Sequence, residues 1–286
     1  MRKLLLGAAA ISLSGCSFLG IGGHNSHYAY QSGPSWGNQH ANVGSSCHSS
    51  HAVLANGKCL SRFSVEGGIG INSQIGGGTF LTGDEAVAVG TDIGKFSTRD
   101  IYDPGLQAEA GLSYAINPYT KVTAMGYISE GKSDGNVSFG SIGAQPLTGE
   151  ISDFESKGIE LGLRRYFNPT AAPGVNSIRP YIEGRVGAAH IDEIEIRNAE
   201  LGGAAFAGGT LGLYESDWVP SAAGLIGFET PLTSRSTVGF ETGLRYTGKP
   251  DANTTGQFAP GQALEGVNDG GARWSVPLML RGRYRF

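Results

Sequence analysis

The last fifteen residues, ARWSVPLMLRGRYRF (residues 272–286), decide the fold that the sequence predicts. Successive side chains of a β-strand point to opposite faces, so this stretch divides into two sets. One set is apolar with aromatic residues at both ends: Trp274, Val276, Leu278, Leu280, Gly282, Tyr284 and Phe286. The other set is basic and includes Arg273, Arg281, Arg283 and Arg285. Aromatic residues flanking an aliphatic band, opposite a charged face, are typical of a strand that crosses a bilayer and faces a polar lumen.

The composition agrees with a closed sheet of short strands. Of the 286 residues, 16% are charged and 40% are hydrophobic, yet the chain has no central apolar run long enough for a transmembrane helix. The 47 glycines separate short alternating segments, which is typical of an all-β protein. A net charge of −4 gives no support for nucleic acid as a partner.

Seven further segments show a strand-like pattern before the final one: residues 62–72, 105–116, 121–130, 152–167, 179–195, 216–230 and 237–247. The connections between them alternate between long, glycine-rich stretches and short turns. The sequence therefore predicts an all-β fold, a transmembrane antiparallel up-and-down β-barrel of about eight strands over residues 62–286. We expect the long connections to be polar extracellular loops and the short turns to face the periplasm.

The end of the chain resembles the C-terminal signal of bacterial outer-membrane β-barrels, carried here by Leu280, Gly282, Tyr284 and Phe286. The strand pattern as a whole resembles small outer-membrane families related to the OmpA transmembrane domain and the porin-like surface antigens. This resemblance covers residues 62–286 and lies in the pattern, not in a motif. It implies a bacterial outer-membrane location, with membrane lipids and the barrel-assembly machinery as partners.

The first residues have the pattern of an export signal. Arg2 and Lys3 precede a short apolar run, residues 4–13, which is too short to span a membrane. The following Leu-Ser-Gly-Cys, residues 13–16, resembles the lipobox of bacterial lipoproteins. The resemblance implies a signal peptide over residues 1–15 and a lipidated Cys16 on the periplasmic side. A periplasmic anchor agrees with a first strand that starts on the side of the short turns.

Residues 16–61 are rich in His, Gly and Ser, and we expect a mostly irregular periplasmic segment. Cys47 and Cys59 favour a disulfide, because an exported chain meets an oxidising compartment. The alternative is a metal site that adds His48 and His51, although the spacing matches no standard zinc pattern. We predict no cofactor, and regard these two histidines only as weak metal candidates.

The predicted inward faces carry both signs of charge. The acidic set is Glu66, Glu109, Glu160, Glu183, Glu229 and Glu241; the basic set is Arg164, Arg185, Arg245, Arg281 and Arg283. Side chains nearly fill the interior of an eight-stranded barrel, and an unpaired buried charge is costly, so we expect an ion-pair network that plugs the lumen. The alternative is a narrow pore, in which glycines such as Gly68, Gly111 and Gly239 leave water-filled gaps.

Three functions follow from this organisation. The favoured one is a non-enzymatic outer-membrane β-barrel lipoprotein with a structural role, whose loops contact a surface or envelope partner. The first alternative is a small porin-like pore for ions or solutes. The second is a lipid-modifying enzyme at the outer surface. Its candidate catalytic residue is His190, which stands beside Asp192 and is the only histidine of the predicted barrel. No serine partner for this histidine is evident from the sequence.

Overall fold

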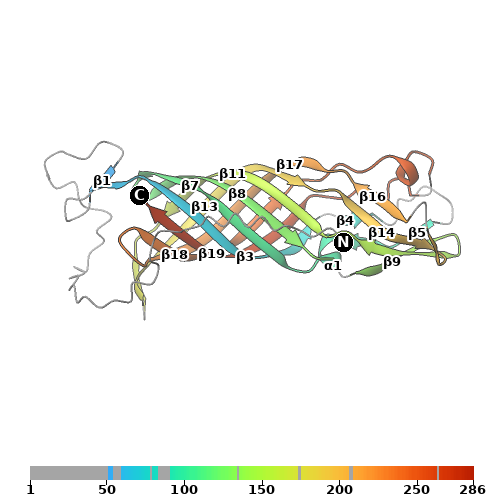
Figure 1. Cartoon of the computed structure of the whole chain (residues 1–286), viewed down its shortest axis with the longest axis horizontal. Helices are drawn as coiled ribbons and strands as arrows, with labels where there is room; N and C mark the ends of the chain where they lie inside the picture. Colours follow the sequence, from blue (N-terminus) through green and yellow to red (C-terminus); the bar gives the residue numbers. More distant parts are fainter. Residues whose placement is uncertain are drawn as a thin grey trace. The chain divides into compact units, whose positions relative to one another are not determined.

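The computed structural model of the protein describes residues 51–53, 59–77, 79–82, 91–133, 135–172, 175–205, 209–262 and 264–286. Eight of its strands form a closed antiparallel barrel (Figure 1). They are β3 (Phe63–Gly77), β7 (Gly105–Asn117), β8 (Thr120–Gly131), β11 (Phe154–Tyr166), β13 (Val175–Ile191), β17 (Asp217–Pro231), β18 (Ser236–Thr247) and β19 (Arg273–Arg285). Each pairs with the next of these strands, and β19 pairs with β3 to close the sheet. The predicted eight-stranded up-and-down barrel is confirmed.

The barrel wall is apolar outside and charged inside. Large aliphatic side chains on every strand are exposed, among them Ile69, Leu106, Val122, Leu161, Val186, Ile226, Leu244 and Leu280. A sheet in water would bury such residues, whereas a barrel in a bilayer turns them to lipid. Aromatic side chains stand at both ends of this belt: Phe63, Tyr114, Phe228, Phe240 and Tyr284 at one end, and Trp218, Tyr246 and Trp274 at the other. No helix among the described residues is long and apolar enough to cross a membrane.

Short connections lie at one end of the barrel. The turn between β7 and β8 is closed by the side chain of Asn117, whose Oδ1 accepts a hydrogen bond from the backbone N–H of Tyr119 at 2.9 Å. Thr233 has the same role between β17 and β18, where its Oγ1 accepts from the N–H groups of Arg235 and Ser236. The connection from β11 to β13 contains β12 (Thr170–Ala172), which pairs with β13. The alternation of long and short connections is therefore as predicted.

The four long connections fold together at one end of the barrel into a region that we call the cap. They join β3 to β7, β8 to β11, β13 to β17 and β18 to β19. Figure 1 places β9, β14 and β16 beyond the end of the barrel opposite to Phe286. One sheet runs in the order β15-β14-β10-β9-β5, with β16 also on β14. Its strands are β5 (Thr91–Ile93), β9 (Asn136–Ile142), β10 (Gln145–Ile151), β14 (Ile194–Leu201), β15 (Ala204–Ala205) and β16 (Thr210–Tyr214). A smaller sheet joins β4 (Thr79–Leu81) to β6 (Phe96–Ser97), which leads into α1 (Thr98–Ile101). The connection from β18 to β19 contains the 3₁₀ turn η1 (Gly256–Phe258).

The cap corrects the expectation that these connections are simple polar loops. It has an apolar core of its own, which includes Phe80, Phe139, Leu147, Ile196 and Leu213, each at most 2% exposed. The physical reason is that each connection alone contains too few apolar residues to form a core. Only the barrel, by holding four of them at one end, lets them bury apolar surface together.

The segment before the barrel is described only in part. Its short strands β1 (His51–Val53) and β2 (Cys59–Ser61) pair antiparallel, within a stretch that we expected to be irregular. The signal peptide, Cys16, Cys47 and His48 lie outside the described residues. The lipid anchor, the disulfide and the metal site therefore stay predictions.

Candidate functional site

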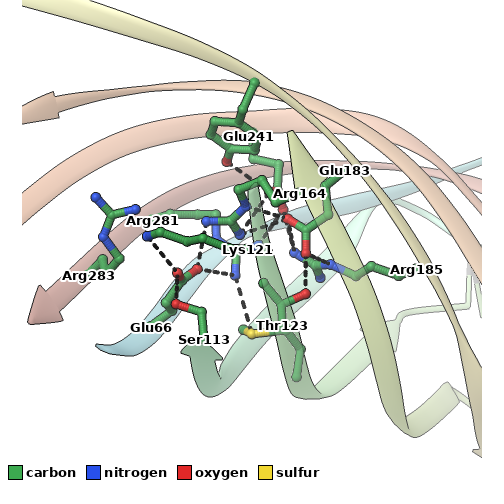
Figure 2. Close-up of polar contacts among 12 residues, drawn as sticks. Glu66, Ser113, Lys121, Thr123, Arg164, Glu183, Arg185, Glu241, Arg281 and Arg283 are labelled. Atoms are coloured by element: carbon green, nitrogen blue, oxygen red, sulfur yellow. Dashed lines mark hydrogen bonds and ion pairs between the residues drawn. The ribbon is translucent and has the colours of Figure 1, made fainter. Parts of the chain in front are cut away.

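The lumen of the barrel contains a continuous network of buried ion pairs. The structure brings together all the charged residues that we predicted to face inward, and each is at most 8% exposed: Glu66, Glu109, Glu160, Arg164, Glu183, Arg185, Glu229, Glu241, Arg245, Arg281 and Arg283. Figure 2 shows most of them pointing toward one another from different strands. The period of two in each strand is what aims these side chains inward.

Arg164 on β11 is the centre of the half of the network nearer the short turns. Its Nη1 lies 2.8 Å from Glu66 Oε2, and its Nη2 lies 2.7 Å from Glu183 Oε2. A third carboxylate, that of Glu229, is 3.3 Å from Nη1. The guanidinium also stacks over the ring of Tyr181, at 4.6 Å from its centroid. Arg164 thus connects strands on opposite sides of the barrel.

Arg185 and Arg245 have the same role nearer the cap. Arg185 Nη1 lies 2.8 Å from Glu109 Oε2, and its Nε donates to Glu183 Oε1 at 2.8 Å. Arg245 Nη2 lies 2.9 Å from Glu109 and 3.1 Å from Glu160. Because Glu109 and Glu183 each bind more than one arginine, the carboxylates are shared and the pairs form one network.

The arginines of β19 complete the network. Arg283 Nη2 lies 2.6 Å from Glu229 Oε2, and Arg281 pairs with Glu241 and with Glu109. Hydroxyl groups use further acceptor sites on the carboxylates: Ser113 donates to Glu66, Thr123 donates to Glu183, and Tyr181 donates to Glu241. Such additional hydrogen bonds offset the cost of removing the charges from water.

One buried cation was missed from the sequence. Lys121 on β8 is 4% exposed, and its Nζ lies 3.9 Å from Glu66 Oε1. The two faces of β8 have mixed composition, so the alternation did not indicate which one is inward. The strands on either side decide it, because Tyr114 of β7 and Leu163 of β11, both outward-facing, pair with Val122.

The lumen is filled around the glycines, which disfavours the alternative of water-filled gaps at these positions. A Cβ at Gly111 would lie 2.1 Å from the carbonyl oxygen of Ala124 and 2.6 Å from Met125 Sδ. At Gly227 it would meet the ring of Tyr181, and at Gly158 that of Tyr127. These glycines therefore leave room for large neighbouring side chains to pack against the inner wall of the barrel. A cavity of about 10 Å³ lies beside Arg164 and has room for about one water.

The network is suited to structure more than to chemistry. Its carboxylates are engaged by guanidinium groups and hydroxyls, so none offers a free base or nucleophile to a substrate. Among the described residues, no group of three or more His, Cys, Asp or Glu is placed to hold a metal ion. The residues of the predicted assembly signal lie elsewhere, on the outer wall: Leu280 and Phe286 are more than half exposed, and a Cβ at Gly282 would meet nothing.

A second cluster lies on the outer face of the barrel, at the rim beside the cap. His190 of β13 accepts or donates a hydrogen bond at Nε2 with Ser216 Oγ, 3.1 Å away, in the residue that precedes β17. Its Nδ1 lies 3.2 Å from Asp192 Oδ1. Ser216 is the partner that the sequence did not reveal. It lies 26 residues from His190, and only the pairing of β13 with β17 brings them together.

Comparison with known proteins gives structural likeness only. No protein-family model and no curated protein matches the sequence. The chain is similar to the crystal structure of Neisserial surface protein A (14% identity, TM-score 0.40), over 79% of this chain and 99% of that one. It is similar to the outer-membrane protein OprG from Pseudomonas aeruginosa (17%, 0.41), over 78% and 95%. A third is Ail, the attachment invasion locus protein of Yersinia pestis (15%, 0.35), over 78% and 98%.

Proposed function

We propose that the protein is a bacterial outer-membrane β-barrel with a sealed lumen, which acts through its cap and not as a pore. The observation that carries the proposal is the filled lumen, crossed by ion pairs whose members are nearly inaccessible to solvent. The apolar belt and its two aromatic ends support insertion in a bilayer. The barrel then serves as the anchor that holds the cap at the membrane surface.

The proposal is tested by single-channel conductance of the refolded full chain in a planar bilayer. We expect no steady conductance, because Arg164, Arg185 and Arg281 bridge the carboxylates across the lumen. A steady conductance in the full chain would contradict the sealed lumen and favour the porin-like alternative. Flotation with phospholipid vesicles, checked in parallel, verifies that the protein is associated with the membrane, and migration of unboiled gel samples verifies that the barrel is folded.

The exposed surface of the cap is acidic, which suggests the chemistry of a partner. Its exposed acidic residues are Asp92, Asp100, Asp103, Glu150, Asp153, Glu193, Glu200, Glu215, Asp251 and Asp269, and its exposed basic residues are Lys95, Arg99, Lys132, Arg197 and Lys249. A field of one sign attracts partners of the other. We therefore propose that the cap contacts a basic surface of an envelope or extracellular partner in a salt-dependent way.

The orientation of the cap is tested by labelling. Ser138 is exposed on β9, so a Ser138→Cys variant places a thiol on the cap. In intact cells, a membrane-impermeant maleimide is expected to label this variant and not the unaltered protein. Labelling that appears only after the outer membrane is permeabilised would place the cap in the periplasm and contradict the proposed topology.

Two finer parts of the proposal concern the ends of the chain. We propose that Cys16 carries the lipid anchor and that the outward residues of β19 engage the barrel-assembly machinery. Incorporation of labelled palmitate that is abolished by Cys16→Ala tests the first. A Phe286→Ala variant that accumulates unfolded, judged by its migration in unboiled gel samples, tests the second.

A further inference from the structure

We propose that Ser216, His190 and Asp192 form a hydrolytic site for ester-linked acyl chains at the outer rim of the barrel. The two ring nitrogens of His190 are engaged on opposite sides, by Ser216 Oγ at 3.1 Å and by Asp192 Oδ1 at 3.2 Å. This is the order of contacts in which an acid orients a histidine and the histidine activates a serine. The proposal rests on the proposed insertion in a bilayer, and it goes beyond the anchoring role.

Strand pairing holds the cluster on the outer face. Lys157 of β11, His190 of β13 and Trp218 of β17 pair side by side in one row. Asp192 follows the end of β13 and Ser216 precedes β17, and their contacts with His190 place both of them on the same face. The His190 side chain is 30% exposed and that of Asp192 is 36% exposed, so a substrate can reach them. The ring of Trp218 stands against that of His190, with the centroids 5.3 Å apart.

The position of the site indicates an amphiphilic substrate. The next row toward the barrel centre is apolar and consists of Ile159, Ala188 and Pro220. Trp218 belongs to the aromatic end of the belt, where such residues mark the boundary between lipid and water. The ester group of a membrane lipid lies at the boundary between lipid and water. An acyl chain that packs against this apolar row would therefore bring its ester group beside Ser216. A site directly above the lipid-facing wall therefore favours a substrate that lies in the membrane over one that is dissolved in water.

The chemistry needs only water as a second reactant. Ser216 Oγ attacks the carbonyl carbon of the ester while its proton passes to His190 Nε2. Asp192 holds the ring with Nδ1–H toward itself and stabilises the imidazolium. When the C–O bond breaks, the proton on Nε2 passes to the alcohol oxygen, and the acyl group stays on Ser216. Water, deprotonated by His190, then releases the carboxylic acid and restores the serine.

Lys157 adds a positive charge beside this machinery. Its Nζ lies 3.2 Å from Asp192 Oδ2 and its side chain is 57% exposed. This ion pair helps to hold the Asp192 carboxylate in place beside His190. Lys157 is therefore a positioning residue in this proposal, and not part of the proton transfer.

The first test uses a fluorophosphonate probe, which reacts with activated serines irrespective of the acyl chain. We expect the folded full chain in detergent to be labelled, Ser216→Ala to lose labelling, and His190→Gln to slow it about 10²-fold or more. Asp192→Asn is expected to slow labelling as well, because the carboxylate that orients the imidazole ring of His190 is gone. Ser138→Ala, at an exposed serine of the cap, is the matched control and is expected to label like the unaltered protein.

The second test identifies the source of the ester. The full chain is inserted in vesicles of phosphatidylethanolamine and phosphatidylglycerol, or in vesicles that also contain lipopolysaccharide, and released fatty acid is measured. Release in the first vesicles assigns glycerophospholipids, and release only in the second assigns lipopolysaccharide. No labelling of the unaltered protein, labelling that persists in Ser216→Ala, or no release from either vesicle overturns the proposal. Migration of unboiled samples verifies that each variant is folded, and flotation tests membrane insertion separately.

Discussion

The barrel and the cap are built from the same chain by opposite rules. Inside the barrel the side chains are charged, as with Arg164 and Glu183, and the apolar residues face out. Inside the cap the core is apolar, as with Phe139 and Leu147, and the charges face out. The difference lies in the surroundings. Lipid accepts apolar side chains on the barrel wall, so its polar ones gather inside, whereas water around the cap drives apolar side chains together.

Single barrel strands change from a charged to an apolar inward face at the end that carries the cap. Along β13, the inward side chains pass from Glu183 and Arg185 to Ala189 and Ile191, and the last two belong to the apolar core of the cap. Arg273 of β19 lies at this boundary, where its guanidinium stacks over the ring of Phe154 at 4.6 Å. The change falls at the level of Trp218 and Trp274 on the outer face, where the proposed insertion places the boundary between lipid and water.

The largest effect is expected from breaking the charge network. Arg164→Met would leave the carboxylates of Glu66, Glu183 and Glu229 without a shared partner in a buried site. We expect a loss of about 3–5 kcal/mol in the free energy of unfolding, measured by urea titration of vesicle-inserted protein. The control is Arg165→Met, an exposed neighbour that donates to the hydroxyl of Thr120 and lies over the ring of Tyr119, with an expected loss below about 1 kcal/mol. If Arg164→Met lowers the free energy of unfolding no more than Arg165→Met does, the network adds no stability.

A smaller effect, confined to the cap, is expected from shortening a leucine in its apolar core. Leu147 is 1% exposed in the cap, and Leu161 is 64% exposed on the barrel wall. Leu147→Ala creates a cavity and is expected to cost about 3 kcal/mol. The result would be faster proteolysis of the cap with the barrel intact. Leu161→Ala leaves no cavity because lipid fills the space, so the same assay should find little change. Loss of the whole barrel in Leu147→Ala would show that the two regions do not unfold separately.

Glycine positions give a third comparison, within the barrel wall. A Cβ at Gly111 would meet the carbonyl oxygen of Ala124, whereas at Gly184 it would meet nothing within 4 Å. Gly111→Ala is expected to destabilise the barrel by about 1–3 kcal/mol through displacement of the neighbouring strand. Gly184→Ala should change stability by less than about 0.5 kcal/mol. Urea titration measures both, and a tolerated Gly111→Ala would argue against the close packing of the lumen.

The smallest expected effect is on the stability of the cap in acid. The hydroxyl and the backbone N–H of Ser97 donate to Asp100 at 2.6 and 3.1 Å, and these bonds hold the pKa of that carboxyl below its usual value. The stabilisation is therefore present above the ordinary Asp pKa and is lost as pH falls through the lowered one. Because Asp100 is exposed, Asp100→Asn should cost only about 0.5 kcal/mol near neutral pH and nothing in strong acid. Limited proteolysis across pH measures this, with Asp92→Asn as the control.

Several features of the barrel were predictable because they are local. The alternation in residues 272–286 alone indicates which side chains of β19 face lipid and which face the lumen. The same period of two assigns Glu66, Glu109 and Arg245 to the interior without reference to their contacts. It failed for Lys121, where both faces of the strand have similar composition.

From the sequence follow the number of strands in the barrel, the facing of all of these strands except β8, and the presence of both signs of charge in the lumen. Each depends only on the pleat of a strand and on whether its surroundings are lipid or water. The tertiary structure alone decided which carboxylate pairs with which guanidinium, that the long connections share one apolar core, and that Ser216 meets His190. These contacts join residues far apart in the chain. They depend on strand register and on closure of the barrel, which no local pattern specifies.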